Sequence, residues 1–424
     1  MRWVRTGAFA AATVAIGLLV GALIGEASLR TYARLDSRFG GSIRELDPLA
    51  IQIEPIGQLG YRQRPNSVFH YANGTTASSN ADGYRGPDVS ETPAPGTVRI
   101  VLLGGSTTHG FGVFDGETID AYMREILPRR HQNVRFEVVN LAFDGYDSYQ
   151  LLERLRTQGL ALHPTVVVMN EGINDVRNAW LPNLREVDPR TLIWEDVLVR
   201  LRDERQRGGH STWTLVKHYS MLARIPGYVR DKLRQRRESQ FHAAELATPN
   251  AASATPGDAN GPPFPAAADR FERNVRAIVA LATSHGARVV LSTPPSALRS
   301  YAPGVTSNRT YWIRDAKTTQ DYRDELARRL QRIASGQERL VRYVAPRVAL
   351  SSFLDDCHLT REGNRAVAEA FADAIDILLG FTGDSTNTNP TRDRALPRAA
   401  MSGVAFNRRD SAESRSLHLT NGQR

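Results

Sequence analysis

The sequence predicts an α/β protein whose parallel, doubly wound sheet is covered by helices on both faces. Short apolar runs rich in β-branched residues alternate along the chain with longer segments of helical periodicity. The apolar runs lack polar alternation, which is typical of strands buried on both faces. Ligands bind to such sheets at the carboxyl ends of the strands, so we expect the functional residues at that edge.

The first strand is predicted over residues 98–103, an apolar run that ends in Gly104-Gly105 and therefore feeds a tight turn. The third run, at residues 165–169, is dense in valine, as strands tend to be. The other strands are predicted at residues 134–140, 287–291 and, from a weaker pattern, 340–344. Together these runs predict a five-stranded sheet.

Helical periods separate and follow the predicted strands, and they cover residues 118–127, 148–160, 271–284, 322–333 and 361–379. Thr360 directly precedes the last of these helices, and threonine is a favoured N-cap because its hydroxyl accepts a hydrogen bond from a free backbone N–H. Strands joined by helices of this length predict the crossovers that parallel pairing requires.

Polar residues with complementary chemistry lie in short segments after the predicted strands. Ser106 follows a glycine pair, Gly145 ends the segment that starts at Asn140, and Asn174 follows Gly172-Ile173. Each of the three comes just past a strand, so all three are expected at one edge of the sheet. A fourth segment, Asp355-Asp356-Cys357-His358, precedes the last helix.

These residue types are the ones that acyl transfer needs. A serine hydroxyl becomes a good nucleophile only when a base removes its proton, and His358 suits that task because histidine titrates near neutrality. Asp355, three residues earlier within a turn, can orient the imidazole and stabilise its charged form. The backbone N–H groups of Ser106 and Gly145 and the side-chain amide of Asn174 would donate to the oxyanion. We therefore predict a serine-centred acyl-transfer site.

Each segment also has a simpler interpretation when it is taken alone. Gly104-Gly105-Ser106 is compatible with an ordinary turn, although no lysine follows at the spacing of a phosphate-binding loop. Asp175 is expected to support its loop. Asp356 is the rival to Asp355 for orienting the histidine. The order of the segments on one alternating frame favours the catalytic interpretation.

Two further residues near these segments receive minor roles. His109 lies close to Ser106, but no orienting carboxylate is evident for it, so we expect it at most to line the pocket. Cys357 is the only cysteine in the chain, so it excludes a disulfide-built fold without indicating a redox compartment. It could be interpreted as a catalytic thiol, but the serine arrangement explains the site without it, and a packing role is preferred.

The four segments together resemble those of the SGNH, or GDSL-type, hydrolases over about residues 97–180 and 270–380. Ser106 resembles the nucleophile of that family, Gly145 and Asn174 resemble its glycine and asparagine, and Asp355 and His358 resemble its Asp-x-x-His pair. The resemblance implies a flavodoxin-like three-layer α/β/α sandwich and a serine esterase without a cofactor. Gly105 stands where the family name expects aspartate, a variant common among envelope-associated members.

The N-terminus predicts a membrane anchor. Residues 7–25 are uncharged and largely apolar and follow Arg2 and Arg5, and roughly 20 such residues span a bilayer. A cleaved signal peptide is the alternative, with Gly25-Glu26-Ala27 as its cleavage site. We prefer a retained anchor within residues 1–26, because the apolar stretch is long for a signal and Glu26 is awkward at a cleavage site. A short basic N-terminus followed by an apolar stretch is typical of exported proteins, so we expect the catalytic domain outside the cytoplasm.

The remaining chain divides by composition. Residues 27–96 form a lead-in that packs on the core, and residues 97–380 form the hydrolase domain. An insertion at 177–269 interrupts that domain; its first part is predicted helical with a break at Pro226-Gly227, and its end, residues 243–268, is a flexible loop. The insertion is a possible lid. Residues 381–424 lack a hydrophobic period and are predicted to be disordered.

The net charge and the distribution of cysteine and histidine limit which partners and metals are expected. The net charge is +9, carried almost wholly by arginine, but no recognisable binding fold accompanies it, so nucleic acid is not expected. The arginine-dense stretch 200–237 includes Trp213 and Tyr219; a solvated helical insertion is preferred for it over a membrane-surface segment. No Cys/His cluster predicts a metal site, and no cofactor is expected.

The sequence thus predicts a membrane-anchored serine esterase that removes an acyl group, such as O-acetyl, from an envelope glycan or a related small molecule. An O-acyltransferase with the same covalent intermediate is the first alternative, because lid closure would exclude water and favour a sugar acceptor. A non-catalytic glycan-binding or assembly protein on the same fold is the second alternative, which the intact set of Ser106, Gly145, Asn174 and His358 disfavours.

Overall fold

Five parallel strands form the central sheet in the order β6-β5-β7-β8-β9. They are β5 (Thr97–Gly104), β6 (Arg135–Asn140), β7 (Val166–Asn170), β8 (Arg288–Ser292) and β9 (Val341–Val344). This computed structural model describes residues 2–36, 39–40, 42–43, 46–49, 52–71, 73–179, 195–230, 232–233, 264–300 and 316–381. The strand order is that of a flavodoxin-like doubly wound sheet, so the predicted fold class is confirmed.

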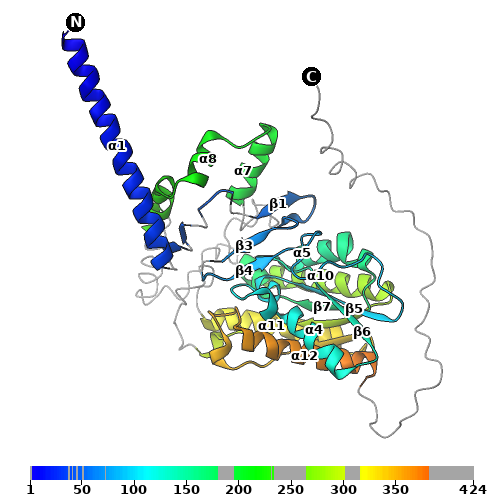
Figure 1. The fold of residues 1–424 in the computed structure, drawn as a ribbon. Helices are drawn as coiled ribbons and strands as arrows, with labels where there is room; N and C mark the ends of the chain where they lie inside the picture. The colour runs from blue at the N-terminus through cyan, green and yellow to red at the C-terminus, as the bar shows by residue number, and fades with distance from the viewer. Residues whose placement is uncertain are drawn as a thin grey trace, which may run out of the picture. The chain divides into compact units, whose positions relative to one another are not determined.

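Helices cover both faces of the sheet (Figure 1). One face packs against α5 (Ser148–Arg154), α10 (Phe264–Ser284) and α11 (Ala316–Ala334), and the other against α4 (Ile119–Arg130) and α12 (Arg361–Leu379). Successive strand residues alternate between the two cores, since side chains of a strand point to opposite faces. Val101 and Leu103 join the first core, whereas Ile100 and Leu102 join the second.

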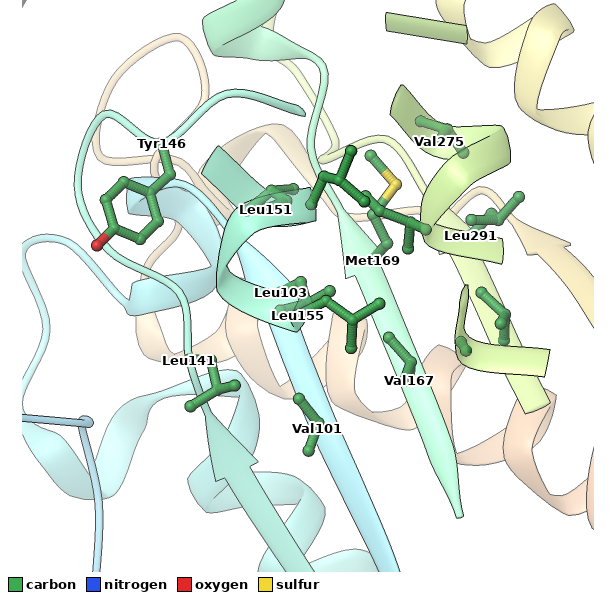
Figure 2. Close-up of a cluster of buried hydrophobic side chains, with 14 of the residues drawn as sticks. Val101, Leu103, Leu141, Tyr146, Leu151, Leu155, Val167, Met169, Val275 and Leu291 are labelled. Carbon is green, nitrogen blue, oxygen red and sulfur yellow. The ribbon is translucent and has the colours of Figure 1, made fainter. Parts of the chain in front are cut away.

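The core around α5 and α10 sets the position of the strand ends that carry the site. Figure 2 shows Val101, Leu103, Val167 and Met169 of β5 and β7 packed with side chains of these helices, and every one is fully buried. Interiors of this density resist displacement, so the loops that follow β5 and β7 leave the sheet from a rigid base.

Several element boundaries differ from the predictions. The helix predicted at 148–160 ends at Arg154, where a π-helical turn over Leu155–Gly159 takes over. The helix predicted from residue 271 begins at Phe264, so residues 264–268 are helical where a flexible loop was expected. Pro226 does not break the insertion, because it lies in the first turn of a helical segment at 225–230, where the missing N–H of proline costs no hydrogen bond.

The lead-in forms two antiparallel hairpins. In the first, β1 (Ile53–Ile56) pairs with β2 (Gly60–Gln63), and in the second β3 (Val68–His70) pairs with β4 (Thr76–Ser78). Tyr61 of β2 is buried and stacks near Phe143 and Tyr146, with its hydroxyl donating to the carbonyl of Asp144 at 3.0 Å. The lead-in is therefore part of the core beside the predicted glycine segment.

The N-terminal helix α1 runs over Arg2–Leu35, beyond the predicted apolar stretch. The part of this helix over residues 10–35 contains a stretch that is long and apolar enough to cross a membrane, a property that signal sequences share. Helix α6 (Ile173–Ala179) leads into the insertion, which contributes α7 (Glu195–Gln206), α8 (Thr212–Tyr219) and a 3-10 turn, η4 (Leu222–Arg224). The tail predicted to be disordered and most of residues 231–263 lie outside the described residues.

Candidate active site

Ser106 begins a short helix directly after the central strand β5. Gly104 ends β5, and α3 (Ser106–His109) starts two residues later, with the carbonyl of Gly105 accepting from the N–H groups of Thr108 and His109. The Ser106 Oγ lies 2.8 Å from His358 Nε2, although the two residues are 252 positions apart. The strand-to-helix turn thus points the hydroxyl at the base that acyl transfer requires.

Asp355 holds the other side of the His358 ring. Its Oδ2 lies 2.7 Å from His358 Nδ1, and its Oδ1 accepts from the backbone N–H groups of Cys357 and His358 at 2.9 and 2.8 Å. In the neutral imidazole, Nδ1–H donates to Asp355, which leaves Nε2 to accept the hydroxyl proton of Ser106. The ring of Phe111 packs on the imidazole at 4.3 Å between centroids, so the orientation of His358 is set by both polar and apolar contacts.

The surroundings of Asp355 and His358 favour the charged forms of both side chains, the carboxylate and the imidazolium. Burial alone would raise the pKa of Asp355, but the hydrogen bond to His358, the His358 charge and the two backbone N–H donors lower it to about 2. Burial lowers the pKa of His358, whereas the Cys357 sulfur and the Asp355 carboxylate raise it, and the net pKa lies well above the usual range of histidine. A carboxylate that stays ionised beside the ring is suited to stabilise an imidazolium.

Asn174 and the loop that holds Gly145 lie against the segment before Ser106, since a Cβ at Gly105 would be 3.1 Å from the carbonyl of Tyr146, the residue after Gly145. Gly145 has a φ of +85°, a conformation that strongly favours glycine. The Asn174 side-chain Nδ2 donates to the carbonyl of Tyr146 at 2.9 Å, which ties the loop after β7 to the loop after β6. A Cβ at Gly105 would come within 2.4 Å of the same Nδ2 atom, so the amide of Asn174 lies directly against the Ser106 segment.

Glu171 is a buried residue of the site that the sequence interpretation missed. Its Oε2 accepts from the N–H of Gly105 at 2.7 Å, and its Oε1 accepts from the N–H of Asn174 at 2.8 Å. A Cβ at Gly105 would lie 2.4 Å from Glu171 Oε2. The carboxylate therefore occupies the space beside residue 105 and excludes a side chain there, which explains the glycine before Ser106. The sequence feature that could have identified Glu171 is its position directly after a buried strand.

His109 has an orienting carboxylate, contrary to the expectation. Its Nδ1 lies 2.9 Å from Asp144 Oδ1 and 3.1 Å from the Tyr71 hydroxyl, which also donates to Asp144 Oδ2 at 3.2 Å. All three residues are buried. Asp144 directly precedes Gly145, so this cluster anchors the Gly145 loop to α3. Sequence reasoning missed it because Tyr71 and Asp144 come from distant segments.

Asp175 and Asp356, the other two acidic residues of the predicted segments, have contacts that do not involve His358. Asp175 accepts from the N–H and Oγ of Ser148 at 3.0 and 2.5 Å, and burial, followed by the charge of Asp147, raises its pKa to about 8. It joins α6 to the start of α5, as a loop-supporting role requires. The Asp356 carbonyl accepts from the N–H of Ala297 at 2.9 Å, whereas Asp355 makes the histidine contact.

Arg85, in the lead-in, is a second buried residue without a predicted role. It is 2% exposed, and its guanidinium donates to Asp115 and to the carbonyls of Thr76, His109, Gly110 and Val113 at 2.6–3.1 Å. Arg85 thereby fastens the chain that follows α3 to the lead-in and limits how far Ser106 can move.

Asp355, Cys357 and His358 are also the types of residue that bind metal ions, and their ligand atoms lie within 4.8 Å of one another. Both ring nitrogens of His358 are, however, engaged by Asp355 and Ser106. A metal on this ring would have to displace one of those hydrogen bonds, so the set fits proton transfer better than metal binding.

A cavity of about 710 Å³ opens beyond the ends of β8 and β9. Four arginines line it, Arg299, Arg323, Arg328 and Arg347, with Asp324 as the acidic residue among the lining side chains. Phe353, two residues before Asp355, also lines it. The cavity has a polar, positively charged wall beside the segment that carries the histidine.

A serine hydroxyl bonded to a histidine that is itself bonded to a buried aspartate has the geometry of nucleophilic catalysis. Fold and site together define a serine hydrolase built on an α/β sandwich. The model of the GDSL-like lipase/acylhydrolase family matches residues 102–366. Because this match covers more than half of the chain, the chain belongs to that family. It is an enzyme that acts on ester bonds, and the resemblance noted in the sequence is confirmed.

Solved structures that are similar to this chain differ widely from it in sequence. A putative acylhydrolase from Bacteroides fragilis is 17% identical, with 68% of this chain and 91% of that chain covered and a TM-score of 0.36. A catalytic mutant of an acetylxylan esterase from Geobacillus stearothermophilus is 15% identical, with coverages of 66% and 95% and a TM-score of 0.36. A comparison with curated proteins finds no match.

Proposed function

We propose that Ser106 is the nucleophile of an acyl-enzyme mechanism in which His358 is the general base and Asp355 orients it. The observation that carries this proposal is the chain from Ser106 Oγ to His358 Nε2 and from His358 Nδ1 to Asp355, with distances of 2.8 and 2.7 Å. His358 takes the hydroxyl proton as Ser106 attacks the ester carbonyl and then returns it to the leaving alcohol. Water next hydrolyses the acyl-enzyme by the same route in reverse.

The oxyanion of the tetrahedral intermediate would be held by the N–H groups of Ser106 and Gly145 and by the Asn174 amide. Support comes from the position of Ser106 at the start of α3 and from the glycine conformation at 145. The Nδ2 of Asn174 has a second N–H besides the one given to Tyr146. Donors already fixed in place stabilise charge without reorganisation during the reaction.

The proposed substrate is an O-acyl ester, such as an O-acetyl group, on an envelope glycan or a related small molecule. The cavity past β8 and β9 supports an alcohol portion with several hydrogen-bonding groups, because the arginines that line it can donate hydrogen bonds. Transfer of the acyl group to a glycan hydroxyl is the alternative that the same site permits. A purely glycan-binding role is disfavoured by the complete hydrogen-bond chain of the triad.

The test is mass spectrometry of the peptide that contains Ser106 after the purified full chain is incubated with an acyl donor such as p-nitrophenyl acetate. We expect an acyl adduct on Ser106 and release of p-nitrophenol, with a loss of at least about 10⁴-fold in Ser106→Ala. Ser335→Ala, an exposed serine at the end of α11, is the control and should retain full activity. An unchanged rate in Ser106→Ala would overturn the mechanism, and discharge of the adduct by an added glycan instead of water would assign the transferase.

We further propose that α1 is retained as a membrane anchor and that the catalytic domain lies outside the cytoplasm. The long helix and the basic residues that precede its apolar stretch support this arrangement. A topology reporter fused after Gly383 should be active only on the extracytoplasmic side. Activity confined to the cytoplasm would contradict the proposed topology without affecting the esterase mechanism.

A further inference from the structure

Helix α8 in the insertion exposes an apolar surface to solvent. Trp213 is 57% exposed and Tyr219 is 70% exposed, and Leu215 and Val216 are exposed with them. Residues 213, 216 and 219 share one side of the helix because they are three positions apart. The opposite side is occupied, since buried Thr214 donates to Glu204 Oε1 at 2.7 Å. Exposed aromatic and aliphatic side chains gathered on one helix face mark an interaction surface.

This segment is fastened to α1 at the end of its apolar stretch. The Glu26 carboxylate accepts from Ser220 Oγ at 2.9 Å and from the N–H groups of Met221 and Leu222 at 3.0 and 3.1 Å. Arg30 donates to the carbonyl of Tyr219 at 2.7 Å and pairs with Glu26. The docking is therefore specific to the turn of α1 that directly follows residue 25.

Apolar packing extends the contact. A Cβ on Gly25 would lie 3.4 Å from the Leu222 side chain, so the two chains approach closely there. Leu29 and Ala33 of α1 pack in one cluster with Met221, Ile225 and Tyr228. Contacts on two successive turns of α1 fix the direction of the segment as well as its attachment point.

The attachment point coincides with the boundary of the proposed membrane span. Residues 7–25 carry no charge, and at about 1.5 Å per residue they reach about the thickness of the hydrocarbon layer. The exposed side chains Leu18, Leu19 and Leu23 of α1 belong to this stretch. Glu26 and Arg30 follow this stretch in the sequence. Charged groups are costly in hydrocarbon, so these two side chains are expected outside it. A segment bound at Glu26 therefore lies at the level of the headgroups.

The segment contains the residue types that are common at the level of the lipid headgroups. Lys217 Nζ lies 6.0 Å from the Trp213 ring, and Lys232 Nζ lies 5.6 Å from the Tyr228 ring. Tryptophan and tyrosine concentrate at the membrane–water interface, where the ring is apolar on one side and polar on the other. Basic side chains near them favour anionic headgroups.

We propose that residues 212–233 rest on the bilayer surface beside the α1 span, with Trp213 and Tyr219 in the headgroup layer and the lysines facing anionic lipid. This inference rests on the proposed anchoring of α1. It assigns part of the insertion a membrane-contacting role in place of the solvated helical segment expected from the sequence.

The test uses the full chain reconstituted into vesicles of phosphatidylglycerol and phosphatidylcholine with brominated acyl chains, which quench tryptophan fluorescence on contact. Subtracting the fluorescence of the Trp213→Phe variant from that of the unsubstituted chain gives the signal of Trp213. The same subtraction with Trp3→Phe gives the signal of Trp3, near the start of α1, as a matched control. Equal circular dichroism spectra establish that both variants fold. We expect the Trp213 component to fall at least about twofold relative to vesicles without bromine.

The outcomes separate the inference from the anchoring on which it rests. Quenching of both tryptophans supports the two together. Quenching of Trp3 without Trp213 overturns the membrane contact of α8, leaves the anchor intact and assigns the apolar face to a protein partner. Quenching of neither overturns the anchor and the inference with it. Esterase activity plays no part in this readout, so the proposed mechanism is tested separately.

Discussion

Asn174 joins the β7 loop to the Ser106 segment through its side-chain amide. Asn174→Ala should lower kcat by about 10²–10³-fold, as the loss of one oxyanion donor does in other acyl-transfer enzymes. KM for a small ester should change little, because the proposed role of the amide is to stabilise charge that develops only in the transition state. Steady-state kinetics with p-nitrophenyl acetate measure both constants. A rate equal to wild type in a folded variant would remove Asn174 from the oxyanion site.

The protonation of His358 predicts the pH dependence of the enzyme. Only the neutral imidazole can accept the Ser106 proton, so kcat/KM should fall as the pH drops through the His358 pKa. That pKa lies well above the usual histidine range, so the acid limb should lie above about pH 6.5. Asp355, with a pKa of about 2, stays ionised throughout and does not shape this limb.

Cys357 should influence the position of that limb because its sulfur helps to raise the pKa of His358. Cys357→Ala should therefore move the acid limb of kcat/KM to lower pH while leaving the plateau rate nearly unchanged. Cys357→Ser keeps the approximate size without an ionisable thiol and should show the same displacement. A limb that stays in place in both variants would exclude the thiol from setting the His358 pKa.

Arg85 shows how one side chain joins elements that are distant in sequence. Its buried guanidinium connects β4, α3 and the chain up to Asp115 by charge-assisted hydrogen bonds to four carbonyls and to the partly exposed Asp115 carboxylate. Arg85→Ala leaves several carbonyls and Asp115 without that partner, so the free energy of unfolding should fall by about 3–5 kcal/mol. Urea unfolding of the detergent-solubilised chain measures this loss.

Arg62→Ala is the matched control for that experiment. Arg62 pairs with Glu54 at 2.7 Å across the β1–β2 hairpin, but the two side chains are 22% and 29% exposed. Partly solvated pairs contribute up to about 1 kcal/mol, so this variant should unfold close to wild type. Equal losses in the two variants would contradict the assignment of Arg85 as the clamp of the Ser106 segment.

The hydrolase and α1 belong to one compact unit that ends at Gly383. A chain that stops at Gly383 should therefore keep kcat/KM within about twofold of the full chain, since domains retain their fold when sequence outside them is removed. A chain that stops at Thr360 is the control; it lacks α12, whose Val367, Phe371 and Ile375 fill one of the two cores, and should not fold. A large loss in the first truncation would place an essential residue beyond Gly383.

Periodicity along the chain was sufficient to predict the sheet and its covering helices. Hydrophobic periods are local properties of strands and helices, so β5 to β9 were located to within a residue or two, and α12 with its Thr360 cap was predicted as observed. The same locality explains the errors. The π-helical turn after Arg154 and the early start of α10 depend on packing that no local period records.

The chemical types of the site residues were also readable in the sequence, because Ser106, Asp355 and His358 lie in short segments at strand ends or before a helix. The hydrogen bond between Ser106 and His358, by contrast, crosses 252 positions and exists only once β5 and the turn before α12 meet at the carboxyl edge of the sheet. Glu171 and the Asp144–His109–Tyr71 cluster were missed for this reason, since buried carboxylates acquire their partners only in the folded chain. Local apolar runs and helical periods encode which segments are buried, whereas the contacts between distant loops depend on how the closed core aligns them.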